Sequence, residues 1–160
     1  MSLTLSPTVV ATLVAVVVGF VGARATVLDS WYRELRKPSW QPPDWAFGPG
    51  WTTIYIFCVW SVSVFWPAAT ESQRTTYLLA WGVNIALNVW WSLLFFRQRR
   101  PDWALREVVL LWLSIASVVL VSYPASPRAA MLLLPYLLWV SFASTLNAAV
   151  VKLNAPFTRT

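Results

Sequence analysis

One face of an apolar segment in the middle of the chain carries polar and aromatic side chains. Four residues at steps of three, four and three make up this face: Trp81, Asn84, Asn88 and Trp91. A helix would place all four on one side. An asparagine surrounded by hydrocarbon must find hydrogen-bond partners or line a cavity. The face therefore indicates either a polar contact between helices or one wall of a binding pocket.

Two further apolar segments carry comparable faces. The earlier one has Trp51, Tyr55 and Cys58 at steps of four and three, and the later one has Trp139, Ala143, Leu146 and Asn147. The small Ala143 leaves room beside the large ring of Trp139. Three faces that combine flat rings with a few hydrogen-bonding groups are what a pocket for a large, planar, mostly apolar ligand requires. Aromatic packing and hydrogen bonding between helices would produce the same pattern, so the pattern alone leaves both interpretations open.

The composition indicates a membrane protein and excludes several kinds of site. Of the 160 residues, 58% are apolar and only 11% are charged, whereas a soluble domain carries about 25% charge. Histidine is absent and Cys58 is the single cysteine. These absences exclude a histidine-ligated haem, a zinc site, a Cys-His or Ser-His-Asp catalytic arrangement and an intrachain disulfide.

Five stretches of the sequence are long enough to position these faces across a bilayer. Each lacks Asp, Glu, Lys and Arg: Met1 to Ala23, Trp45 to Thr70, Thr75 to Phe96, Val108 to Pro127 and Ala129 to Val151. A helix of about 20 residues crosses the roughly 30 Å of hydrocarbon. The sequence therefore predicts an all-α fold, an integral membrane bundle of five transmembrane helices that forms one domain over residues 1–160. The expected helices are about Ser6–Val27, Phe47–Trp66, Thr75–Phe96, Trp103–Tyr123 and Ala129–Leu153, the second ending at Pro67 and the last bending at Pro135.

The first connection, Leu28 to Phe47, is rich in tryptophan and proline. It contains Trp31, Pro38, Trp40, Pro42, Pro43 and Trp45. A short helical turn is expected around 31–35, and the prolines should keep the rest extended because proline lacks a donor and restrains the residue before it. Tryptophan often anchors loops at the membrane surface, but three in one connection exceed that need. We therefore expect a stiff lid over the membrane domain.

The basic residues predict the orientation in the membrane. Ten of them fall on one side of a five-helix arrangement, namely Arg24, Arg33, Arg36, Lys37, Arg97, Arg99, Arg100, Arg106, Lys152 and Arg159, and only Arg74 and Arg128 fall on the other. The positive-inside rule then places the ten in the cytoplasm and the N-terminus outside. The net charge of +6 is explained by this topology, and no nucleic-acid partner is expected.

The first segment also raises the questions of cleavage and of oligomeric state. Met1 to Thr8 lacks the basic residues of a secretory signal, so the first span is expected to be retained. A stripe of small residues in it runs Ala11, Ala15, Gly19 and Ala23. Small residues let another helix approach closely, and packing within the bundle and a homodimer interface both fit.

The deepest charges, Arg24 and Glu107, lie near the cytoplasmic helix ends, which argues against a proton-coupled antiporter or a retinal protein.

Several motifs together resemble the TspO/MBR family of tryptophan-rich sensory proteins and translocator proteins. The most specific block is Trp31-Tyr32, Leu35, Lys37-Pro38-Ser39-Trp40-Gln41-Pro42-Pro43, Trp45, Trp51-Thr52 and Tyr55. Further matches are Leu87-Asn88, Trp91, Phe95-Phe96, Arg99, Trp103-Ala104-Leu105, Pro135-Tyr136-Leu137, Trp139, Phe142-Ala143 and Leu146-Asn147. The order, the spacing and the number of spans all agree over nearly the whole chain.

The resemblance implies a five-helix bundle, often dimeric, that binds porphyrins such as protoporphyrin IX and other planar hydrophobic ligands beneath the first loop. It links the family to tetrapyrrole and stress regulation. It also implies that no cofactor is covalently bound. The carried-over pocket residues are Trp51, Asn84, Trp139 and Ala143, with Trp31 and Trp40 from the lid; with the faces above, the expected ligand-binding set also includes Tyr55, Asn88 and Trp91.

The resemblance leaves three functional classes open. The leading one is a receptor or sensor that binds porphyrin. The others are a light-dependent porphyrin-degrading enzyme, with photochemical roles for Trp51, Trp139 and Trp31, and a tetrapyrrole transporter.

One departure from the family pattern concerns cholesterol. Eukaryotic members carry a cholesterol-recognition pattern with a tyrosine near the end of the fifth helix, where this chain has Ala148 and Ala149 before Lys152. The departure argues against cholesterol as a ligand and favours a bacterial inner-membrane protein.

Overall fold

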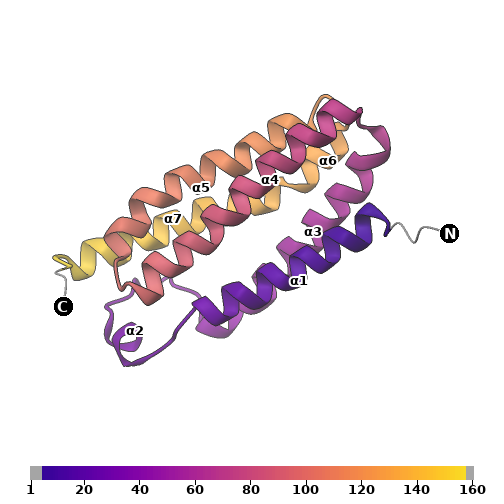
Figure 1. Ribbon diagram of the computed structural model, residues 1–160. Coiled ribbons are helices and arrows are strands. Elements are labelled where there is room, and N and C mark those ends of the chain that lie inside the picture. The colour runs from indigo at the N-terminus through magenta and orange to yellow at the C-terminus, as the bar shows by residue number, and fades with distance from the viewer. Residues whose placement is uncertain (1–4, 158–160) are drawn as a thin grey trace.

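The computed structural model describes residues 5–157, and these form helices and connections without a strand. The elements in chain order are α1 (Pro7–Ala25), α2 (Ser30–Glu34), η1 (Asp44–Ala46), α3 (Phe47–Ala68), α4 (Glu71–Ser92), η2 (Leu93–Arg97), α5 (Pro101–Ser122), α6 (Pro127–Leu132) and α7 (Leu134–Asn154) (Figure 1). Five helical segments of the described chain are long and apolar enough to cross a membrane. The predicted all-α bundle of five spanning helices is thus confirmed.

Two helix ends differ from the sequence expectation by about one turn or less. Helix α4 begins at Glu71 and not at Thr75, because Thr70 and Gln73 form a capping box in which the Gln73 side chain accepts from the Thr70 amide at 2.8 Å. Such reciprocal bonds satisfy donors that a helix start otherwise leaves free. Helix α3 continues through Pro67 to Ala68, since a proline in the last turn disturbs few helical bonds.

The last span is broken and not merely bent. Helix α6 ends at Leu132 and α7 begins at Leu134, with Pro135 as its second residue. Proline has no amide hydrogen to continue the preceding helix but fits a first turn well. The Ser126 hydroxyl accepts from the Ala129 amide at 3.2 Å and so starts α6 at Pro127, earlier than predicted.

The α4–α5 connection is shaped by a wide helical turn. The segment η2 is a π-helix, in which the Gln98 amide reaches back to the Leu93 carbonyl at 2.9 Å. Such wide turns often occur at functional sites. After η2, Arg99 has a φ of 53°, a left-handed conformation that costs energy for a residue with a side chain. This turn brings α5 back along α4.

A polar network joins α4, α5 and α7 inside the bundle. The Asn84 amide donates to the Ser114 hydroxyl at 2.9 Å, the Tyr136 hydroxyl donates to the Asn84 carbonyl at 3.1 Å, and the Asn88 amide donates to the Tyr136 hydroxyl at 3.1 Å. All four side chains are buried. Buried polar groups in hydrocarbon need such partners, so the network fixes the relative position of the three helices.

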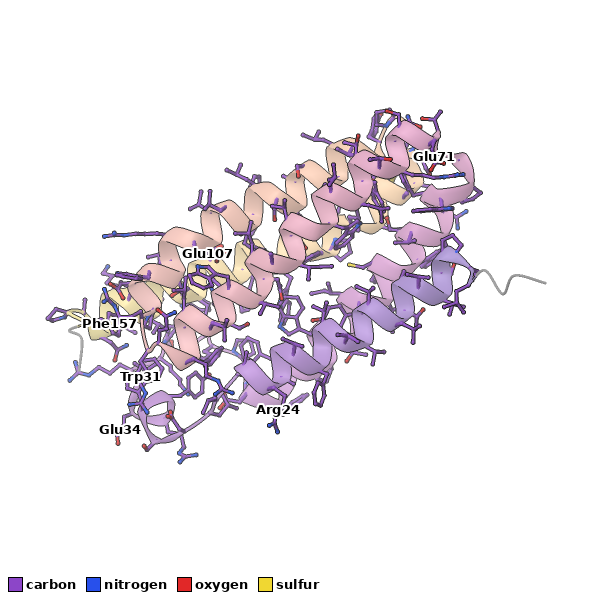
Figure 2. The ribbon with its side chains drawn as sticks, in the orientation of Figure 1. Arg24, Trp31, Glu34, Glu71, Glu107 and Phe157 are labelled. Carbon is purple, nitrogen blue, oxygen red and sulfur yellow. The ribbon has the colours of Figure 1, made fainter. Side chains whose placement is uncertain are left out.

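The two ends of the bundle carry different connections. Figure 2 shows Arg24, Trp31, Glu34 and Phe157 at one end and Glu71 at the opposite end. The α1–α3 connection, the α4–α5 connection and the end of α7 therefore share one end, which we call the lid end. This is the grouping of loops that the count of basic residues assumed.

Candidate ligand-binding cavity

A cavity of about 1130 Å³ lies between α1, α3, α4 and α7. The α1–α3 connection, residues 28–46, covers it at the lid end, and we call this segment the lid. Most of the lining is apolar or aromatic; the charged groups lie at the lid, and hydroxyl groups occur along the whole cavity. A cavity of this size and composition matches sites for small organic molecules.

Aromatic rings from α3 and α7 form one wall of the cavity. Trp51 is stacked on Tyr55, with ring centroids 5.7 Å apart, and meets Trp139 edge to face at 6.0 Å. Trp51 also touches Tyr136 of the polar network, at 5.9 Å. Because Tyr136 is held by Asn84 and Asn88, the buried network positions this wall from behind.

Glycine is required at position 50 of α3, where the Trp139 ring of α7 packs against the helix. A Cβ atom at Gly50 would lie 2.5 Å from the nearest atom of the Trp139 ring. That is far inside van der Waals contact, so any larger residue would displace the ring or the helix. Gly50 therefore allows Trp139 of α7 to lie directly against the backbone of α3.

The opposite wall comes from α4 and η2. Asn88, Trp91 and Ser92 line it together with Phe95 and Phe96. Trp91 and Phe95 lie 5.2 Å apart at a tilt. The π-helical turn places the two phenylalanines beneath the lid. This wall supplies flat surfaces together with the hydrogen-bonding groups of Asn88 and Ser92.

Polar residues of the lid form the roof of the cavity. The Tyr32 hydroxyl donates to Asp44 at 3.0 Å, and Gln41 donates to the same hydroxyl at 3.4 Å. The Lys37 ammonium lies 3.7 Å from the centre of the Tyr32 ring. Burial, with a further effect of Asp44, raises the pKa of Tyr32, so this residue acts as a neutral hydrogen-bond donor. Because the Tyr32 proton is donated to Asp44, the group that the roof offers to an anionic ligand below is the Lys37 ammonium.

The lid is tied to the bundle at two places. The Asn154 side chain, at the end of α7, accepts from the Arg36 amide and donates to the Arg36 carbonyl, both at 2.8 Å. Asp29 pairs with Arg99 at 2.9 Å. The backbone amide of Tyr32, followed by Arg99, lowers the pKa of Asp29. These contacts position the roof above the aromatic walls.

The structure brings six of the nine predicted ligand-binding residues to the cavity. They are Trp51, Tyr55, Asn88, Trp91, Trp139 and Ala143. The other three lie beside it: Trp31 packs edge-on against Phe95 at 6.5 Å, Trp40 packs against Phe142 at 6.0 Å and is half exposed, and Asn84 is committed to the polar network. These three support the lid or the aromatic wall from outside the cavity.

Sequence reasoning missed the wall residues Ser92, Phe95 and Phe96 and two larger groups of lining residues. One is the polar roof, Tyr32, Lys37, Gln41 and Asp44. In the sequence each of these polar residues stands next to a proline or a tryptophan of the lid. The other is the face of α1 formed by Thr8, Thr12, Ala15, Gly19, Gly22 and Thr26. Gly19 lies close to the Tyr55 ring, since a Cβ there would be 3.1 Å from it. Part of the predicted small-residue stripe thus packs inside the bundle, and the homodimer stays a prediction.

Comparisons with known proteins agree with the motifs. Residues 10–153 match the sequence profile of the TspO/MBR family. The chain is 39% identical to the tryptophan-rich protein TspO of Chlorobaculum tepidum over 140 residues, covering 86% of this chain and 89% of the relative. It is 38% identical to the translocator protein of Homo sapiens, covering 84% and 82% of the two chains. It is 36% identical to Protein CrtK of Rhodobacter capsulatus, covering 78% and 79%.

Proposed function

This chain belongs to the TspO/MBR family of membrane proteins, and from that premise we propose that its cavity binds porphyrins of the protoporphyrin IX class. The protein would act as a receptor or sensor linked to tetrapyrrole and stress regulation. The observation that carries the proposal is the aromatic cavity beneath a polar roof.

The chemistry of the cavity matches that of a porphyrin. A porphyrin is a large flat ring with carboxylates on one edge. Trp51, Trp139 and Trp91 offer flat surfaces from two opposite walls, and stacked rings attract one another beyond the area they bury. Lys37, which lines the cavity at the roof, offers an ammonium group to a carboxylate, and hydrogen bonds between ionised groups are shorter and stronger than those between neutral groups.

A titration with protoporphyrin IX tests this proposal. Replacing Trp51 and Trp139 by phenylalanine should weaken binding by about 0.5 to 1.5 kcal/mol for each indole replaced by the smaller ring, measured from porphyrin absorbance in detergent or nanodiscs. Trp45→Phe is the matched control, because Trp45 is 75% exposed and does not line the cavity. A double variant with an unchanged dissociation constant would overturn the proposed site.

We also propose the orientation that the basic residues predict, with the lid in the cytoplasm of a bacterial cell, the N-terminus outside and the protein in the inner membrane. The charge asymmetry of the loops supports it. A reporter fused after Thr160 should be active in the cytoplasm, and one inserted at Glu71 should be active in the periplasm. The reverse pattern would place the roof outside.

Light-dependent porphyrin degradation is a second candidate, favoured by the contacts among the cavity rings. Trp51 touches Tyr55, Tyr136 and Trp139 within 6.0 Å between centroids, so an electron given up by one ring to an excited porphyrin could be replaced by the next. Molecular oxygen would supply both oxygen atoms of the two carbonyl groups formed when a carbon–carbon double bond of the porphyrin ring opens, and the oxidised tryptophan would recover its electron in that reaction. Illumination in air should then bleach the porphyrin absorbance with wild type and not with Trp51→Phe. Equal bleaching by both would leave binding as the function.

A further inference from the structure

The cavity has two parts with different walls. Near the lid it is enclosed by α1, α3, α4, η2, α7 and the lid, and we call this part the chamber. Towards the other end, only two helices contribute to the lining, and we call this part the groove. Its wall is formed by Thr8, Thr12 and Ala15 of α1 and Val59, Trp60 and Ser63 of α3.

The groove is open on its side. In the chamber, residues of α4 and α7 close the space between α1 and α3, but none of the described residues of α4 or α7 that line the cavity reaches beyond Asn88 or Trp139. In Figure 1 α1 lies away from α5 and α7. The long helices would lie in the bilayer, so the open side of the groove faces lipid.

The groove is elongated and uncharged, as a site for a hydrocarbon chain requires. From Thr8 to Ala15, α1 rises about 1.5 Å per residue, so the groove is about 10 Å long. The hydroxyls of Thr12 and Ser63 in its wall donate to backbone carbonyls of their own helices. Within the described residues, the charged groups that line the cavity, Lys37 and Asp44, are both at the roof. An amphiphile would therefore place its charged edge under the lid and its apolar part along α1 and α3.

We propose, on the basis of the porphyrin-binding function above, that the ligand is a planar ring bearing a long alkyl ester, with the ring in the chamber and the chain in the groove. The chamber and groove are one continuous cavity. The flat rings of Trp51 and Trp139 fit a planar ligand, whereas a membrane lipid would place a flexible chain against them. The open side also lets such a ligand enter from the bilayer without leaving hydrocarbon.

Two esters of the same porphyrin test the inference. Monomethyl and monohexadecyl protoporphyrin IX carry the same ring and the same charge and differ only in the chain. Their dissociation constants would be measured with the full chain in nanodiscs and corrected for partition into empty nanodiscs. Wild type should bind the hexadecyl ester about tenfold more tightly, equal to about 1.4 kcal/mol.

Variants of α1 separate groove binding from partition into lipid. Ala15→Phe or Thr12→Phe would fill the groove and should abolish the tenfold gain, so that each variant binds the two esters with equal affinity; helicity shows that each variant folds. Val17→Phe is the matched control, because Val17 is 60% exposed and does not line the cavity, and it should keep the gain. Equal affinity of wild type for both esters, or a gain that survives both groove variants, would overturn the inference with porphyrin binding intact. Failure of both esters to bind would overturn the proposed function itself.

Discussion

The two sides of the bundle are packed differently. On the packed side, formed by α4, α5 and α7, 39% of the residues in the most apolar part of α5 are buried. On the open side, formed by α1 and the face of α3 towards it, the corresponding share of α1 is 11%. The packed side holds the polar network and fully buried residues such as Ile115, whereas the open side holds small residues facing the cavity.

The difference indicates that the packed side stabilises the fold and that the open side provides the space for a ligand. Helices in lipid have no hydrophobic driving force towards one another and depend on close packing and hydrogen bonds. The network of Asn84, Ser114, Asn88 and Tyr136 supplies such bonds on the packed side. The space for a ligand is found where packing is weakest, because a filled interior would have to be emptied first.

The largest expected effect is on the stability of the packed side. Ile115 is completely buried in α5, so Ile115→Ala should leave a cavity and lower the free energy of unfolding by about 2 to 5 kcal/mol. Val17→Ala, at an exposed position of α1, should change it by less than about 0.5 kcal/mol. Reversible unfolding in mixed detergent micelles measures both. Equal losses would contradict the division between the two sides.

A smaller effect is expected at Gly50, where the Trp139 ring of α7 lies against the backbone of α3. Gly50→Ala forces a methyl group into the Trp139 ring and should cost about 1 to 3 kcal/mol through displaced side chains, seen mainly as weaker porphyrin binding. In Gly82→Ala the new methyl group meets no atom within 4 Å, and Gly82 does not line the cavity, which makes it the matched control in a spanning helix. Porphyrin titration of both variants checks the result, and similar affinities would show that Trp139 is free to move.

The lid attachment should affect the rate of ligand release. Asn154→Ala removes both hydrogen bonds to the Arg36 backbone, and a net loss of about 1 kcal/mol corresponds to about fivefold faster porphyrin dissociation. Asn154→Asp keeps the acceptor and loses the donor, so it should lie between wild type and Asn154→Ala. Stopped-flow displacement measures the rates. An unchanged rate in both variants would mean that the lid does not hold the ligand.

The smallest effect is a pH dependence of the lid. Folding lowers the pKa of Asp29 from its ordinary value of 3.8, so its carboxylate stabilises the docked lid above that value, and the stabilisation is lost as the pH falls through the lowered pKa. The effect is small because the carboxylate is exposed and screened. Hydrogen exchange at the Tyr32 amide should accelerate in that acid range in wild type. In Asp29→Asn the exchange should be faster at neutral pH with a weaker acid dependence, whereas Glu34→Gln should behave like wild type.

The sequence by itself determined the five spans, the short helix in the lid and the family. Apolar stretches of about 20 residues specify spanning helices directly, because every backbone group in lipid must be bonded within its own helix. Thus α1, α3 and α5 begin or end within about two residues of the expected positions. The aromatic residues Trp51 and Trp139 could be assigned to the cavity because each stands at helical spacing from other residues that line it.

Tertiary structure alone decided which member of each face reaches the cavity. Asn84 and Asn88 are one turn apart on the same face, yet Asn84 is enclosed by Ser114 and Tyr136 while Asn88 reaches the lining. In the lid, Tyr32 lines the cavity and the neighbouring Trp31 lies outside it. Helical periodicity fixes only the direction in which a side chain leaves its own helix. The element that covers it depends on how α5, α7 and the lid pack against that helix, and those contacts join residues far apart in the sequence.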